Sequence, residues 1–202
     1  MTLDALILIA ASYLVGSIPF GVIVGRLKGF DPRAVGSGNI GMTNVARAGG
    51  KGAAAATFIG DLVKGAGPVA FARAMGFAPA VIASAGFAAF LGAICSIFLR
   101  FRGGKGVSAS LGIWAVLAPL PLVLALTAFV VVFAVTRIMS LASISAAIVL
   151  VPAVAALAGP RPYLALAIAM SALVLFRHHE NIRRLMAGEE PRFQARKGDR
   201  AA

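Results

Sequence analysis

Acidic residues, histidine and cysteine are scarce in this chain of 202 residues, which contains 7 Asp and Glu, 2 His and one Cys. The single cysteine, Cys95, excludes an internal disulfide and leaves the redox compartment open. Charged residues make up 13% of the chain, about half the share typical of soluble domains. Aromatic residues make up 8% and are mostly Phe within apolar runs, so a soluble nucleic-acid-binding fold is not favoured and no nucleic-acid partner is predicted.

Apolar residues dominate instead, since they form 60% of the chain and its mean hydropathy is +0.93. A helix needs about 20 apolar residues to cross a bilayer, so this chain has room for about seven crossings. The composition predicts an all-α, polytopic integral membrane protein with about seven transmembrane helices in a single domain, 1–202. The expected spans are 3–24, 52–75, 78–99, two short helices within 107–135 that turn at Pro119 and Pro121, 140–157, and 163–176. The last run is short and is expected to continue as helix past Phe176, and 191–202 are expected to form a flexible basic tail.

The basic residues support one orientation of these spans. There are 19 Lys and Arg, which give the chain a net charge of +12. If the N-terminus lies outside, the inner segments are 26–51, 100–105, 136–139 and 177–202, and they contain five, three, one and seven of the basic residues, 16 of the 19. Because cytoplasmic loops are enriched in Lys and Arg, this distribution predicts an outside N-terminus and a cytoplasmic C-terminus.

The first inner segment contains a glycine-rich loop. Its residues 36–41 have the spacing GxGxxG, and Asp61 follows twenty residues after Gly41, as in a dinucleotide-binding fingerprint. No buried strand precedes the loop and no βαβ unit fits here, so the nucleotide interpretation fails. Glycine N–H groups can still converge on an anion, and a forked guanidinium suits phosphate. Polar candidates in this loop are Ser37, Asn39, Thr43, Asn44 and Arg47. A plain glycine loop is the alternative.

A second glycine-rich turn lies at 103–106, around Lys105. It is not a Walker A loop, because Leu99 stands where the first glycine should be and Gly106 replaces the Ser or Thr after the lysine. A glycine turn that enters a helix N-terminus can nevertheless bind phosphate, with the lysine as a point charge. The alternative is a tight cytoplasmic turn with a lysine that only marks topology.

Two further clusters involve titratable groups. His178 and Asn181 are three residues apart, so they share a helix face, and an imidazole beside an amide suits the acceptance of a hydroxyl proton. The adjacent His179 points elsewhere, so no metal site is predicted. Asp61 and Lys64 lie inside a span and could pair, and a functional and a structural role are both open.

Four segments in this order, 16–21, 36–47, 103–107 and 178–185, closely resemble the motifs of the PlsY family of acyl-phosphate:glycerol-3-phosphate acyltransferases. The resemblance extends from about residue 6 to residue 191. It implies a seven-helix enzyme of the bacterial inner membrane with its active site at the cytoplasmic face of the lipid bilayer. Such an enzyme transfers a fatty acyl group from acyl phosphate to the sn-1 hydroxyl of glycerol 3-phosphate, giving lysophosphatidic acid and inorganic phosphate. Neither a metal nor a cofactor is expected, and the oligomeric state stays open.

The family pattern also implies roles for individual residues. Glycerol 3-phosphate would be held by Ser37, Arg47, Lys105 and Ser143. His178 and Asn181 would act as catalytic groups at the reacting hydroxyl. The acyl-phosphate pocket would be formed by Asn39, Asn44, Gly103 and Gly104. Either His178 or a substrate phosphate could accept the hydroxyl proton.

One stretch departs from the family pattern. Family members usually carry Gly-His-x-x-Pro at the end of the third span, but this chain has Ala93 and Ser96 at the His and Pro positions. This departure allows a divergent paralogue that acylates another phosphorylated acceptor. A small membrane transporter is the alternative of a different class, and it rests on Asp61 and Lys64.

Overall fold

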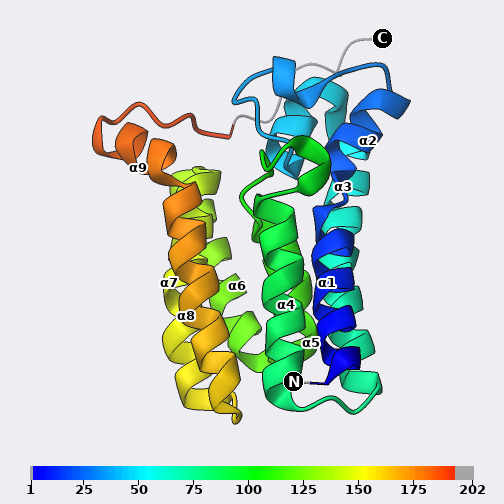
Figure 1. Cartoon of the computed structure of the whole chain (residues 1–202). Coiled ribbons are helices and arrows are strands. Elements are labelled where there is room, and N and C mark those ends of the chain that lie inside the picture. The colour runs from blue at the N-terminus through cyan, green and yellow to red at the C-terminus, as the bar shows by residue number, and fades with distance from the viewer. Residues whose placement is uncertain (1, 194–202) are drawn as a thin grey trace.

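The computed structural model describes residues 2–193, which form an all-helical bundle (Figure 1). The helices of this part are α1 (Leu3–Ser17), α2 (Phe20–Leu27), α3 (Met42–Ala74), α4 (Pro79–Ile94), α5 (Val107–Leu117), α6 (Pro119–Thr136), α7 (Met139–Leu157), α8 (Arg161–Arg177) and α9 (His179–Met186), with 3-10 turns η1 (Pro32–Ala34) and η2 (Ile97–Leu99). The long helices alternate in direction. As a result, the α2–α3, α4–α5 and α6–α7 connections and α9 lie at one end of the bundle, and the N-terminus lies at the other.

The expected spans agree with the helices in position but not in continuity. The first one is broken, because α1 ends at Ser17 and α2 begins after Pro19. The second expected span corresponds to α3, which begins at Met42, ten residues earlier than expected. Non-helical dihedral angles at Gly50 kink this helix. The predicted turn in the long apolar run is confirmed, since α5 ends at Leu117 and α6 starts at Pro119. Helix also continues past Phe176, as α9. The expected basic tail lies mostly in 194–202, outside the described residues.

Four helical stretches within residues 2–193 are long and apolar enough to cross a membrane by themselves. They are Leu3–Leu27, Pro79–Leu99, Pro119–Thr136 and Met139–Leu157. The helix α3 differs because it carries charged residues in its interior, and α5 differs because it has only 11 residues.

Glycines bring two helix pairs into direct backbone contact. A methyl group at Gly16 of α1 would lie 2.0 Å from the Ala89 carbonyl oxygen of α4. A methyl group at Gly65 of α3 would lie 2.1 Å from the Ala109 carbonyl oxygen of α5. Small residues at such crossings are the usual way for helices in lipid to gain packing energy. The pairs α1–α4 and α3–α5 therefore hold the two glycine-rich segments at the same end of the bundle.

Replacement of Gly65 by Ala should destabilise the protein, because the added methyl group collides with the backbone of α5. The expected loss is about 1–3 kcal/mol, and a thermal unfolding scan in detergent should show it as a lower Tm. Gly67→Ala is the matched control, since Gly67 lies two residues away on α3 and an added methyl group meets nothing within 4 Å. Equal Tm values for the two variants would contradict the close approach of α3 and α5.

Candidate functional site

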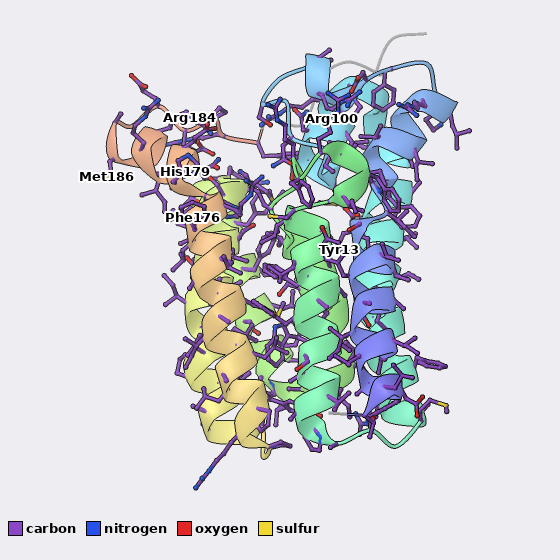
Figure 2. The ribbon with its side chains drawn as sticks, viewed as in Figure 1. Tyr13, Arg100, Phe176, His179, Arg184 and Met186 are labelled. Carbon is purple, nitrogen blue, oxygen red and sulfur yellow. The ribbon has the colours of Figure 1, made fainter. Side chains whose placement is uncertain are left out.

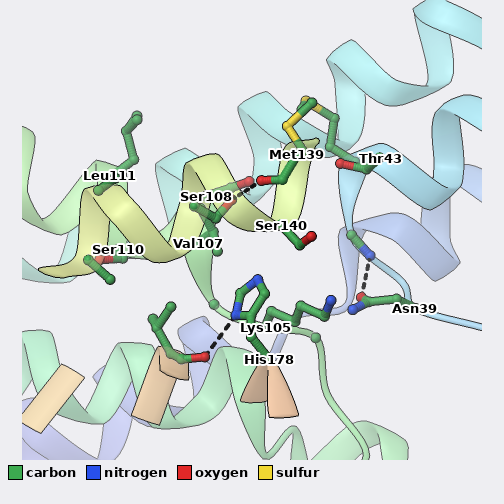
Figure 3. Close-up of a pocket in the computed structure, with 18 of the residues that line it drawn as sticks. Asn39, Thr43, Lys105, Val107, Ser108, Ser110, Leu111, Met139, Ser140 and His178 are labelled. Carbon is green, nitrogen blue, oxygen red and sulfur yellow. Dashed lines mark hydrogen bonds between the residues drawn. The ribbon is translucent and has the colours of Figure 1, made fainter. Parts of the chain in front are cut away.

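A cavity of about 930 Å³ opens at the end of the bundle where the glycine-rich segments meet (Figure 3). Its polar part is lined by the two loops, by the first turns of α7 and by the start of α9. Its apolar part continues between α5, α6, α7 and α8. The apolar walls include Leu111, Trp114, Leu122, Ala125, Leu126, Phe129, Val130, Ala146, Ala147, Leu150 and Val174. One continuous space therefore connects a cationic end with a lipid-like interior.

Of the ten residues to which the family pattern gives roles, nine line this cavity, as does the further loop candidate Thr43. The nine are Ser37, Asn39, Asn44, Arg47, Gly104, Lys105, Ser143, His178 and Asn181. Gly103 does not line it, and its carbonyl oxygen instead accepts a hydrogen bond of 2.9 Å from Arg177. The structure thus brings together residues that are up to 144 positions apart in the chain, counted from Ser37 to Asn181 (181 minus 37).

The first loop is held in shape by Asn44. The amide nitrogen of this buried side chain donates to the carbonyl oxygens of Pro32, Val35 and Asn39 at 2.7–2.9 Å, and its oxygen accepts from the Ser37 N–H at 3.1 Å. Gly36 has φ of +57°, a left-handed conformation that favours glycine. The amide group of Asn44 is therefore committed to the loop, which leaves other groups to meet a ligand.

Arg47 is one of those groups. It lies on the first turns of α3, and its Cδ is 3.6 Å from the position that a Gly36 methyl group would occupy. Its guanidinium is exposed and forms no hydrogen bond or ion pair with any residue from 2 to 193. A planar guanidinium free of protein partners at the rim of a cavity is well suited to a bidentate phosphate contact.

The second loop lies against the end of α4. The N–H groups of Gly103 and Gly104 donate to the carbonyl oxygens of Ile94 and Ala93 at 3.2 and 3.0 Å. These two N–H groups are consequently used by the protein itself. The first N–H groups of α5, which begins at Val107, are the ones that a helix leaves free for an anion.

Lys105 and Asn181 connect the second loop to α9. The Lys105 ammonium donates to the Asn181 side-chain oxygen, and the Asn181 amide donates in turn to Glu190. Figure 3 shows the Lys105 side chain extending between the His178 ring and Asn39. Burial lowers the pKa of Lys105 to about 8, an effect that neighbouring Glu190 opposes and Arg184 adds to.

His178 sits at the junction of α8 and α9 and is 2% exposed. Its Nδ1 lies 2.8 Å from the Val174 carbonyl oxygen. A carbonyl oxygen can only accept, so Nδ1 carries the proton and the lone pair of the neutral ring is on Nε2. Burial, together with the positive charge of Lys105, lowers the pKa of His178 to about 4. The ring is therefore a neutral hydrogen-bonding group at neutral pH.

Sequence reasoning missed Glu190, which follows α9. Its side chain is 7% exposed and accepts hydrogen bonds from Ser140, Asn181 and Arg184, the last of these an ion pair of 2.7 Å. Burial acts to raise the pKa of Glu190, but these hydrogen bonds outweigh it, so the pKa lies below its usual value. No local motif identifies this residue, because its partners come from α7 and α9.

The predicted pair of Asp61 and Lys64 is confirmed, with 2.7 Å between the carboxylate and the ammonium. Both residues border the cavity. At the positions that depart from the family pattern, Ala93 lines the cavity wall and the Ser96 hydroxyl donates to the Ser17 carbonyl oxygen. Within residues 2–193 no group of three or more His, Cys, Asp or Glu side chains is placed to hold a metal ion.

Comparison with known proteins gives one consistent result. A family model described as glycerol-3-phosphate acyltransferase matches residues 6–188. The chain is 47% identical to a glycerol-3-phosphate acyltransferase of Geobacter sulfurreducens, over 96% of this chain and 100% of the relative. It is 46% identical to one of Rubrobacter xylanophilus, over 95% and 96% of the two chains.

Two solved structures are also similar. The crystal structure of PlsY, an integral membrane glycerol 3-phosphate acyltransferase, in its glycerol 3-phosphate form superposes with a TM-score of 0.90 at 40% identity, over 95% of this chain and 96% of that one. The lysophosphatidic acid form superposes with a TM-score of 0.89 at 38% identity and the same coverage.

Replacement of Glu190 by Gln should loosen the link between α9 and the cavity. It removes the charge that binds Arg184, so we expect a loss of about 1–2 kcal/mol. Because the pKa of Glu190 is lowered in the folded state, its contribution is present above its usual value of 4.5 and is lost as the pH falls through the folded-state pKa. Thermal unfolding should therefore show a lower Tm for the variant at pH 7 and a smaller difference in strong acid.

The matched control for this experiment is Glu189→Gln, since Glu189 is the exposed neighbouring acid. An equal effect of the two substitutions on Tm at pH 7 would refute the buried network.

Proposed function

The chain belongs to the PlsY family of glycerol-3-phosphate acyltransferases, and we propose that it uses acyl phosphate as the acyl donor in the cavity described above. It is a multi-pass integral membrane enzyme that acylates glycerol 3-phosphate to lysophosphatidic acid, in phospholipid synthesis. The observation that carries the donor proposal is the continuity of the cavity between a cationic loop end and an apolar interior. Such a space suits a donor that joins a fatty chain directly to a phosphate.

The acceptor phosphate is assigned to the gap between the two loops. Arg47 supplies a free guanidinium there and Lys105 an ammonium, and Ser37 and Ser143 add hydroxyl groups. The acyl phosphate is assigned beside them, against Asn39 and the start of α5, with its chain along the apolar walls. In this assignment Asn44, Gly103 and Gly104 shape the pocket rather than touch the phosphates, because their polar groups already have protein partners.

Direct transfer needs no covalent enzyme intermediate, because an acyl phosphate is already activated. The hydroxyl oxygen of the acceptor attacks the acyl carbon, the bond from that carbon to the phosphate oxygen breaks, and inorganic phosphate leaves. Asn181 and His178 are assigned to the hydroxyl group, which they orient by hydrogen bonds. Lys105 uses one lone pair of the Asn181 oxygen and Glu190 one hydrogen of its nitrogen, so the amide is held in place. Unlike Asn44, whose nitrogen serves three carbonyl groups, Asn181 keeps one lone pair and one hydrogen for the hydroxyl.

The proton of the hydroxyl is assigned to a substrate phosphate rather than to His178. A phosphate monoester has a second pKa of about 6. The pKa of the buried His178 is about 4, so its imidazole is the weaker base of the two. The ring then serves as a neutral hydrogen-bonding partner at Nε2.

We also assign seven membrane crossings, with the cavity at the cytoplasmic face of a bacterial inner membrane. The first crossing consists of α1 and α2, and each helix from α3 to α8 supplies one more. The α2–α3, α4–α5 and α6–α7 connections and α9 lie at the end that contains the cavity. They include Arg33, Arg100, Arg137 and Arg183, in agreement with the positive-inside rule.

Purified protein in detergent should form lysophosphatidic acid from glycerol 3-phosphate and palmitoyl phosphate, at a rate unaffected by EDTA. Palmitoyl-coenzyme A should give no product, because its thioester places no phosphate directly on the acyl carbon for the cationic end of the cavity to hold. Mass spectrometry of the lipid product and a phosphate-release assay provide the measurement. Turnover with the coenzyme A ester alone would refute the donor assignment while leaving the acyltransferase class intact.

The pH dependence of kcat/KM for glycerol 3-phosphate should be bell-shaped. The rate should rise through about pH 6, as the phosphate becomes a dianion. It should fall through about pH 8, because the free Lys105 ammonium loses its charge there. Lys105→Arg should move the falling limb beyond pH 10, since a guanidinium stays charged.

The same profile tests the proton acceptor. His178→Gln should keep the rising limb near pH 6 while it lowers kcat. A rising limb near pH 4 in the native protein, absent from His178→Gln, would assign the proton to the imidazole instead.

A further inference from the structure

The C-terminal end of α1 makes two contacts that the proposed reaction does not use. The Ile18 carbonyl oxygen accepts a hydrogen bond of 2.9 Å from the Lys64 ammonium of α3. The adjacent Ser17 carbonyl oxygen accepts one of 2.6 Å from the Ser96 hydroxyl, which follows α4. Lys64 is 4% exposed and Ser96 is 2% exposed. One side chain from α3 and one from the segment after α4 therefore converge on two consecutive carbonyl groups.

The helix break at Pro19 explains why these carbonyl groups need partners. Proline has no N–H and α1 ends before it, so the Ser17 and Ile18 carbonyl oxygens have no regular helical donors. Besides Lys64, the Ile18 oxygen accepts a bond of 3.2 Å from the Phe20 N–H, whereas the Ser17 oxygen depends on Ser96. A buried carbonyl group without a partner is costly, above all in a protein that lies in lipid. A cation at a helix C-terminus is also favoured by the helix dipole.

The contact through Lys64 leads to the first loop. On α3, Gly60 lies one turn before Lys64 and packs against the Phe20 ring at the start of α2. The next residue of α2, Gly21, is so close to the Ile40 carbonyl oxygen that a methyl group there would be 1.8 Å away. Ile40 belongs to the loop that carries Ser37 and precedes Arg47. The position of the break thus determines where the first loop lies.

The contact through Ser96 leads to the second loop. The preceding carbonyl group, that of Cys95, accepts a hydrogen bond of 2.7 Å from the Tyr13 hydroxyl of α1, at the junction of α1 and α4 (Figure 2). The end of α4 then holds Gly103 and Gly104 through their N–H groups. Lys105 is the next residue, so its position relative to α1 depends on the same helix break at Pro19.

We infer that Lys64 and Ser96 are positioning residues that set the separation of the two phosphate loops by binding the carbonyl groups at the end of α1. The inference rests on the proposed placement of the acceptor phosphate between Arg47 and Lys105. A single phosphate that contacts both loops is sensitive to their separation, whereas the chemical step depends on groups of α8 and α9. Loss of either anchor should therefore weaken acceptor binding more than it slows turnover.

Two variants test the inference. Ser96→Ala removes one anchor. The double variant Asp61→Leu with Lys64→Met removes the other without leaving a buried carboxylate alone, which would be strongly destabilising. Titration calorimetry with glycerol 3-phosphate, in detergent and without donor, should show a Kd about tenfold higher for each variant, as expected from a displacement of about 1 Å or less. Steady-state assays should show a similar rise in KM for glycerol 3-phosphate and a kcat within about twofold of the native value.

Both variants have matched controls. Ser84→Ala removes an α4 hydroxyl that, like the Ser96 hydroxyl, donates to a backbone carbonyl oxygen, but on the exposed surface. Arg73→Met removes another α3 cation that donates to a carbonyl oxygen of a neighbouring helix, at the far end of the bundle. Neither should change the Kd.

Ser96→Pro is a second variant in case Ser96→Ala fails to fold. It also removes the hydroxyl, and proline stiffens the turn without changing its shape, because φ of Ser96 is already −65°.

An unchanged Kd in a folded variant, with only a lower Tm, would overturn the assignment for that residue and leave it a structural role. The binding measurement uses no acyl donor. A failure of the acyl-phosphate proposal would therefore appear in the assay of the native protein and not in these Kd values.

Discussion

Each interruption of a helix in this bundle leaves backbone carbonyl groups without helical donors, and inside a membrane no water is present to donate a hydrogen bond to them. Close to the cavity, the protein meets this requirement with specific donors. Lys64 and Ser96 serve the end of α1, and the N–H groups of Gly103 and Gly104 serve the end of α4. Arg177 then donates to the carbonyl oxygens of the same two glycines. The hydrogen bonds that satisfy the backbone are thus the ones that fix the irregular segments of the site.

The charged side chains of the cavity fall into two groups, those that form an ion pair and those that do not. Glu190 neutralises Arg184, and Asp61 neutralises Lys64. Arg47 has no partner among residues 2–193, and Lys105 bonds to the neutral amide of Asn181. A phosphate placed as proposed would therefore meet two cations whose charge is not balanced by a direct ion pair within residues 2–193. Burial holds the pKa of Lys105 near 8 in the free site, and a bound dianion favours its charged form.

The parts of this site that the sequence predicts are those encoded in short stretches of chain. The two glycine loops, the shared face of His178 and Asn181, and the Asp61–Lys64 pair all follow from local spacing. The break at Pro19 lies within a continuous apolar run, so hydropathy alone does not predict it. The start of α3 at Met42 and the use of the Gly103 and Gly104 N–H groups accompany contacts with carbonyl groups several residues away, which local spacing does not reveal.

Glu190 shows most clearly which residues of the site the sequence does not predict. In the sequence it is one acid beside another, at the start of an expected basic tail. Its importance arises only when α9 turns it back to Ser140 and Asn181.

The low pKa of His178 follows from the same architecture and shapes the chemistry. A histidine that fixes its Nδ1 proton on the Val174 carbonyl group must be buried at the end of α8, and burial beside Lys105 disfavours its charged form. A charged imidazolium would compete with Arg47 and Lys105 for the phosphate groups and draw them away from the loops. A neutral ring instead offers only the lone pair of Nε2, which the proposed assignment directs to the hydroxyl group. In that proposal the substrates bring their own base in the phosphate group, so the protein needs to supply orientation and cationic partners rather than a strong proton acceptor.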